Sequence, residues 1–77
     1  MRIVKEASER KNEILDVAER LFYERGYDNT STNDILAEIG IARGTLYYHF
    51  KSKEDILDAM IERVLNKTIS NAKKVAL

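Results

Sequence analysis

Apolar residues recur at intervals of three and four along most of the chain, which is the period of an amphipathic helix. In the amino-terminal third this stripe comprises Ile14, Val17, Ala18, Leu21 and Phe22. It predicts a helix that begins near Ser8, a suitable N-cap, and ends near Arg25. Gly26 can take the left-handed conformation that often follows a helix, and Tyr27 is expected to fold back on Phe22.

Two shorter helices are predicted next. Positions 30–32 all carry hydroxyl side chains, any of which can cap a helix whose apolar side is formed by residues 35, 36 and 39. Gly40 ends this helix, and residues 42–50 leave room for barely two further turns. Two short helices around a glycine, with a helix before and another after, describe a helix-turn-helix core at about residues 31–50.

A long last helix is predicted from about Lys53 into the seventies. Ser52 followed three residues later by Asp55 is an acidic variant of the capping box. The apolar residues of this helix cover more of its circumference than one stripe requires: Ile56, Leu57, Met60, Ile61, Val64, Leu65 and Ile69. Such a helix is expected to contact the core on one side and another neighbour on the other.

Proline is absent and strand-like alternation is missing, so the fold class is predicted to be all-α. The expected architecture is a three-helix, homeodomain-like helix-turn-helix core followed by a long fourth helix. A chain of 77 residues supplies one domain at most.

Charge and composition narrow the functional classes. Thirteen basic and thirteen acidic residues cancel, so any attraction to nucleic acid depends on how charge is distributed. Residues 41–53 carry three positive charges, on Arg43, Lys51 and Lys53, and no negative charge. There is no cysteine and only one histidine, and no run approaches the roughly 20 apolar residues that span a bilayer. We therefore expect no metal, no cofactor and no membrane partner, and a cytoplasmic location fits.

The helix at 42–50 carries the unusual chemistry. At about 100° per residue, Leu46 and Phe50 fall on one side and Gly44, Thr45 and Tyr48 point away from it. A solvated face usually carries lysine, glutamate or glutamine. A glycine, a small hydroxyl and a large ring suit the groove of a DNA duplex instead.

Flanking side chains fit the same chemistry. Arg43 can fork onto guanine or a phosphate, and phenolic hydroxyls, a histidine nitrogen and Lys53 can donate to phosphate oxygens. Structural roles remain open at the same positions. Tyr47 and Tyr48 can be half-buried packing residues, His49 a satisfied structural histidine and Arg43 a solvated cation.

Two strings, ILDVAERLFYERGY and GYDNTSTNDILAEIGIARGTLYYHFKSKEDIL, resemble the DNA-binding half of the TetR/AcrR family of bacterial transcriptional repressors. The resemblance covers about residues 10–60 and includes the telling order glycine, threonine, leucine, tyrosine, a variable residue, histidine, phenylalanine. It implies a DNA-binding domain over 8–68, with 69–77 continuing the last helix toward an absent carboxy-terminal domain for inducer binding and dimerisation.

The resemblance also implies roles by position. Thr32 would hold a phosphate at the start of the second helix. Base edges or the nearby backbone would be met by Ala42, Arg43, Gly44, Thr45 and Tyr47. Phosphates would be clamped by Tyr48, His49 and Lys53. The expected function is sequence-specific binding to double-stranded DNA by a dimer, on a pseudo-palindromic operator in the nucleoid, most simply as a repressor.

A second hypothesis stays open: a helical protein-interaction module that docks through its long last helix and never meets DNA. Salt separates the two, because DNA affinity falls steeply as salt rises and an apolar interface hardly changes. An enzyme is not expected, because no nucleophile with its base, no cofactor loop and no ligand cluster can be assembled from this sequence.

Overall fold

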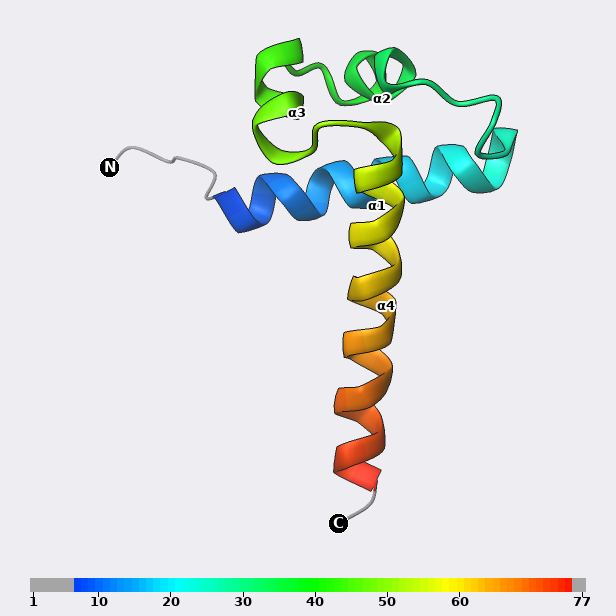
Figure 1. Ribbon diagram of the computed structural model, residues 1–77, viewed down its shortest axis with the longest axis vertical. Coiled ribbons are helices and arrows are strands. Elements are labelled where there is room, and N and C mark those ends of the chain that lie inside the picture. Colours follow the sequence, from blue (N-terminus) through cyan, green and yellow to red (C-terminus); the bar gives the residue numbers. More distant parts are fainter. Residues whose placement is uncertain (1–6, 76–77) are drawn as a thin grey trace.

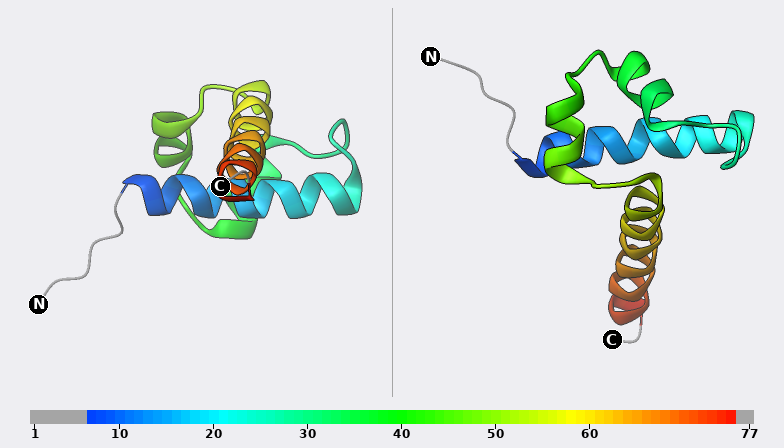
Figure 2. Two further views of the ribbon diagram at one scale, coloured as in Figure 1. Left: turned by 90° about the horizontal axis from the view of Figure 1, so that it is seen from below. Right: turned by 45° about the horizontal axis from the view of Figure 1, so that its top comes forward.

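A computed structural model describes the backbone of residues 7–75 and the side chains of residues 7–67. This part of the chain forms α1 (Ala7–Arg25), α2 (Thr32–Ile39), α3 (Arg43–His49) and α4 (Lys53–Val75), and no strand. In Figure 1, α2 and α3 lie together on one side of α1, and α4 extends away from the other side. Figure 2 shows the same arrangement from two further directions. The predicted all-α architecture is confirmed.

The end of α1 is closed as predicted. Gly26 has a φ of +88°, and its amide donates to the Phe22 carbonyl at 2.8 Å. The Tyr27 ring packs edge-on against Phe22, with 5.0 Å between the ring centroids. The start near Ser8 is predicted closely, but the N-cap is not: α1 already includes Ala7, so Ser8 lies inside its first turn.

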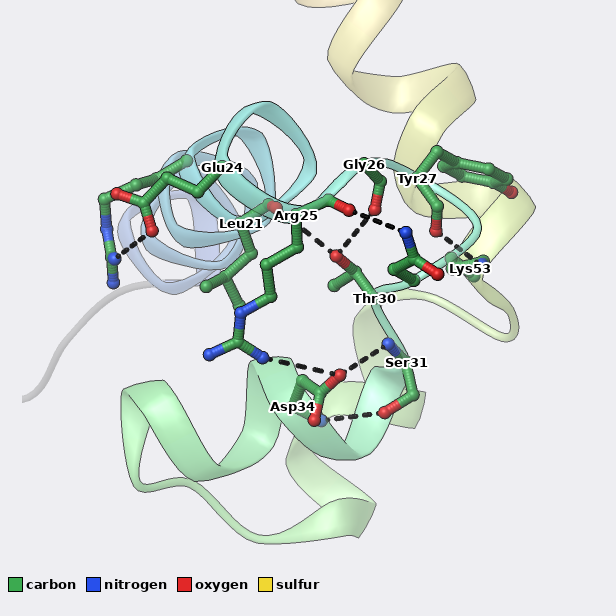
Figure 3. A network of polar contacts seen from close by, with 11 residues as sticks. Leu21, Glu24, Arg25, Gly26, Tyr27, Thr30, Ser31, Asp34 and Lys53 are labelled. Carbon is green, nitrogen blue, oxygen red and sulfur yellow. Dashed lines mark hydrogen bonds and ion pairs between the residues drawn. The ribbon is translucent and has the colours of Figure 1, made fainter.

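Of the three hydroxyl residues before α2, Ser31 is the N-cap. Its hydroxyl accepts from the Asp34 amide at 3.1 Å, and its own amide donates to the Asp34 carboxylate at 2.9 Å, which completes a capping box (Figure 3). The bond from the Ser31 amide is the main reason that the pKa of Asp34 lies below its ordinary value. Gly40, with a φ of +82°, ends the helix as predicted.

Thr30 has a different role, because it ties the connector to α1. Its side chain is buried, and its hydroxyl donates to the Gly26 carbonyl at 2.9 Å and lies 3.3 Å from the Leu21 carbonyl (Figure 3). A buried hydroxyl with such acceptors fixes the path of the chain between α1 and α2.

The start of α4 differs from the predicted capping box in one bond. The Ser52 hydroxyl accepts from the Asp55 amide at 3.1 Å, as expected. The Asp55 carboxylate, however, accepts from the amide of Lys51 at 3.1 Å, and not from that of Ser52. The return bond is therefore displaced by one residue, and it orders the turn that joins α3 to α4.

All four helices contribute to one hydrophobic core, which comprises Ile14, Leu15, Ala18, Leu21, Ile35, Leu46, Phe50, Ile56 and Met60. The predicted stripe on α1 is only partly right: Leu15 is buried, whereas Val17 and Phe22 are half-buried. Because α1 packs against α2 and is also crossed by α4, its buried arc is broader than one stripe (Figure 1).

Two further features mark the junction of α1 and α4. The Arg63 guanidinium pairs with Asp16 at 2.9 Å and lies 3.8 Å from Glu19. On α4 near these ion pairs, the apolar side chains of Ile61, Val64 and Leu65 are 49, 51 and 55% exposed. Among the described residues, no helix has the length and apolar character needed to cross a bilayer.

Candidate nucleic-acid interface

The two sides of α3 differ as predicted. Leu46 and Phe50 are buried and anchor the helix in the core. Gly44 is exposed, Thr45 is partly exposed and the Tyr48 ring is 76% exposed. The outer side of α3 therefore presents a ring, a hydroxyl and bare backbone to its surroundings.

The fold itself does not require a glycine at position 44. Its φ is not positive, unlike those of Gly26 and Gly40, and a Cβ added there would meet nothing within 4 Å. A residue with a side chain would also stabilise the helix, because glycine is a poor helix former. The absence of a side chain at this position leaves the backbone of α3 open to its surroundings.

Two polar contacts connect α3 to the start of α2. The Tyr47 hydroxyl and the Thr32 hydroxyl lie 3.2 Å apart, so two of the predicted site residues meet although they are on different helices. The Arg43 guanidinium donates to the Asn33 amide oxygen at 2.7 Å. Sequence reasoning missed Asn33, which comes beside Arg43 only when the short connector folds α3 back over the start of α2.

The lysines after α3 are each held by a backbone carbonyl. Lys51 Nζ donates to the Tyr47 carbonyl at 2.9 Å. Lys53 Nζ donates to the Tyr27 carbonyl at 2.8 Å and lies 4.2 Å from the centroid of the Tyr27 ring (Figure 3). Both lysines line an open depression, which is bordered by residues 28–32, 47 and 51–53. The depression thus brings together Thr32, Tyr47 and Lys53, as well as the starts of α2 and α4.

Tyr27 contacts Lys53 through both its carbonyl and its ring. Its hydroxyl is buried and has no hydrogen-bond partner among the described residues. This burial, reinforced by the nearby carboxylates of Glu54, Asp28 and Asp58, raises the pKa of the Tyr27 phenol. The phenol therefore stays neutral to higher pH than an ordinary tyrosine does.

The remaining predicted residues lie at the two ends of α3. Ala42 is the exposed N-cap and makes no side-chain capping bond. His49 is half-buried, with its ring 5.0 Å from that of Tyr48 and 6.4 Å from that of Phe50. From α1, Lys11 Nζ lies 5.8 Å from the Phe50 ring centroid, which adds a cation that sequence reasoning did not assign to this surface.

The charged side chains of residues 41–53 are all of one sign. The segment 41–53 contains no acidic residue, while its own three cations and Lys11 lie around the helix. Within the described residues, no three histidine, cysteine, aspartate or glutamate side chains gather as metal ligands would. The chemistry of this surface is that of hydrogen-bond donors, rings and cations, which suits a polyanion.

The family model of bacterial regulatory proteins, tetR family, matches residues 14–60, which include α2, α3 and the first turns of α4. The chain belongs to the tetR family. The resemblance identified in the sequence is thereby confirmed.

Solved structures of tetR-family proteins share the fold. A TetR/AcrR regulator from Thermobifida fusca YX-ER1 superimposes with a TM-score of 0.78 at 40% identity, over 80% of this chain and 34% of that protein. A regulator of the same family from Aquifex aeolicus VF5 gives a TM-score of 0.76 at 43% identity, over 78% of this chain and 35% of that protein.

Curated tetR-like relatives have similar sequences. An HTH-type transcriptional regulator of Staphylococcus aureus strain bovine RF122 / ET3-1 is 44% identical over 71 residues, which are 92% of this chain and 38% of the relative. Its counterpart in strain USA300 is 42% identical over the same length. The tetR-family chain therefore spans little more than a third of the length of these relatives.

Proposed function

We propose that this domain binds double-stranded DNA sequence-specifically, with α3 in the major groove, as the DNA-binding part of a TetR-type transcriptional repressor. The observation that carries the proposal is the outer side of α3, where Gly44, which the fold does not need, lies on the same helix as the exposed Tyr48 ring. Residues 41–53, which include α3, carry no acidic side chain. A duplex groove accepts an α-helix whose backbone comes close to the base edges.

Four residues on the first turn of α3 would face the bases. Arg43 has five donors in a planar fork, so one N–H can stay with Asn33 while others reach guanine. Thr45 offers a hydroxyl to a base edge or a methyl to thymine, and Gly44 lets the backbone approach. Ala42, exposed at the N-cap, would touch the bases or the adjacent backbone.

Five residues around this turn would hold the sugar-phosphate backbone. Thr32 and Tyr47, already 3.2 Å apart, offer two hydroxyls from different helices. Lys53 supplies a cation from the start of α4, and Tyr48 and His49 offer donors at the carboxy-terminal end of α3. Such contacts fix orientation and register, while base contacts select the sequence.

The intact protein would act in the cytoplasm, at the nucleoid, as a homodimer on a pseudo-palindromic operator. Two recognition helices would meet half-sites about one helical turn apart, and occupancy would block transcription. In this proposal residues 8–68 form the DNA-binding domain, and 69–77, of which residues 76–77 lie outside the described part of the chain, lead toward a carboxy-terminal domain that dimerises and takes a small-molecule inducer. The half-exposed apolar residues 61, 64 and 65 support a further neighbour for α4.

Selection of bound sites from random double-stranded DNA, with two copies of the chain held together, tests this proposal. Recovery of a palindrome with a fixed spacing is expected, and recovery of no enriched sequence would refute sequence-specific binding. Arg43→Ala should then relax the preference at one base pair at a cost of about 1–3 kcal/mol. Lys53→Ala is the matched control, because it should weaken all sequences alike and reduce the salt slope by about one.

The apolar hollow at the α1–α4 junction favours a second candidate function, docking of another protein. It is lined by Glu19, Met60, Ile61, Val64 and Leu65. If docking through α4 is the sole activity, DNA binding is absent at low salt and a protein complex survives high salt.

A further inference from the structure

Lys53 is held before any ligand arrives. Its ammonium donates to the Tyr27 carbonyl at 2.8 Å and lies 4.2 Å from the centre of the Tyr27 ring, a contact that joins the start of α4 to the turn after α1 (Figure 3). A lysine ammonium has three N–H donors, and among the described residues this one makes a single hydrogen bond, to the Tyr27 carbonyl. Two donors therefore remain for a ligand.

The position of this ammonium matters because the lysine side chain has four rotatable bonds. A solvated lysine loses much rotamer freedom when it binds a phosphate, and that loss weakens binding. A cation already seated on an aromatic face has lost part of that freedom beforehand, and the ring engages only the side of the ammonium that faces it.

We propose that Tyr27 is a positioning residue for DNA binding, whose ring holds the Lys53 ammonium at the depression beside Thr32 and Tyr47, where a backbone phosphate would lie. The inference rests on the DNA-binding function proposed above and adds to it a residue that lies outside α3. Lys51 offers an internal comparison, because it lines the same depression with the same charge but is held by the Tyr47 carbonyl.

The carbonyl and the ring of Tyr27 can be separated by substitution. Tyr27→Leu keeps the carbonyl and an apolar side chain against Phe22 but removes the aromatic face. Tyr27→Phe keeps the face and removes only the hydroxyl. We expect Tyr27→Leu to weaken binding to any duplex about two- to fivefold and Tyr27→Phe to bind like the parent chain.

A double-mutant cycle isolates the coupling. The full chain and its variants are titrated onto a fluorescent duplex of mixed sequence, about three helical turns long, between about 50 and 200 mM salt. Circular dichroism at the assay temperature establishes that each variant is folded. Tyr27→Leu is measured in the parent chain, in Lys53→Ala and in Lys51→Ala.

Loss of affinity through Tyr27→Leu in the parent and in Lys51→Ala, but not in Lys53→Ala, is the expected result. An equal loss in all three backgrounds would show that Tyr27 serves only the fold and would overturn the proposal. So would an unchanged affinity for Tyr27→Leu beside a weakened Lys53→Ala, although the DNA-binding function would then stand. If Lys53→Ala binds like the parent at every salt concentration, both the positioning role and the phosphate contact of Lys53 are refuted.

Discussion

Substitution of Gly44 by alanine should change stability and DNA binding in opposite directions. The added methyl group meets no protein atom within 4 Å, and the residue lies in α3 with a φ that is not positive. Alanine is therefore accommodated without strain and lowers the conformational freedom of the unfolded chain. On a surface pressed against DNA, the same methyl group would stand between the helix backbone and the bases.

The two effects have different expected sizes. Replacing a helical glycine by alanine stabilises a protein by about 0.5–1 kcal/mol, which raises the Tm of a domain of this size by about 2–8 °C. Forcing a methyl group into a close-packed contact costs about 1–3 kcal/mol, which corresponds to a loss of affinity of about 5- to 150-fold. Gly44→Leu should fold equally well and abolish binding.

Thermal unfolding and titration of a selected operator duplex measure the two quantities on the same samples. Gly40→Ala is the matched control, because its added Cβ also meets nothing within 4 Å but its φ is +82°. That conformation costs an alanine about 1–2 kcal/mol, so Gly40→Ala should lower the Tm. The pair separates a glycine that the fold requires from one that it does not.

Retained affinity in Gly44→Ala and Gly44→Leu would refute the reasoning, because it would mean that the backbone of α3 does not approach the bases. A lowered Tm for Gly44→Ala would contradict the structural part of the argument.

Three further predictions concern the fold. Leu46→Ala removes a fully buried side chain that anchors α3 and should cost about 2–5 kcal/mol in urea unfolding; a cost below about 1 kcal/mol would contradict its place in the core. The raised pKa of Tyr27 stabilises the folded state below the ordinary value of 10.0, and this contribution is lost as pH rises through the folded-state pKa. Tyr27→Phe should therefore lose less stability than the parent chain when pH is raised above 10.0 in thermal unfolding. An identical loss in the two proteins would contradict the raised pKa. The lowered pKa of Asp34 adds stability at pH values above 3.8, and this contribution is lost as pH falls through the folded-state pKa. Asp34→Asn should therefore make the free energy of unfolding depend less on pH in the acid range. An unchanged acid dependence would argue against the capping box.

Local features of this protein were determined by the sequence alone. Helix ends depend on bonds within a few residues of the end. The sequence therefore predicted the ends of α1 and α2 from Gly26 and Gly40, and the starts of α2 and α4 from the hydroxyl residues before them. The period of the apolar residues likewise separated the buried from the exposed side of α3, because side-chain direction is fixed once a segment is helical. The errors at Ser8 and in the return bond of Asp55 are small shifts at helix ends, where the boundary of a helix is least sharply defined.

The contacts that assemble the proposed site were decided by tertiary structure. Thr32 meets Tyr47 across 15 residues and Lys53 meets Tyr27 across 26, and neither pairing follows from a repeat or a motif. Leu15, which lies outside the predicted apolar stripe of α1, is likewise buried by contacts with other helices. Such contacts depend on how α4 and the α2–α3 pair cross α1, which is fixed by the packing of the whole core and not by any local pattern.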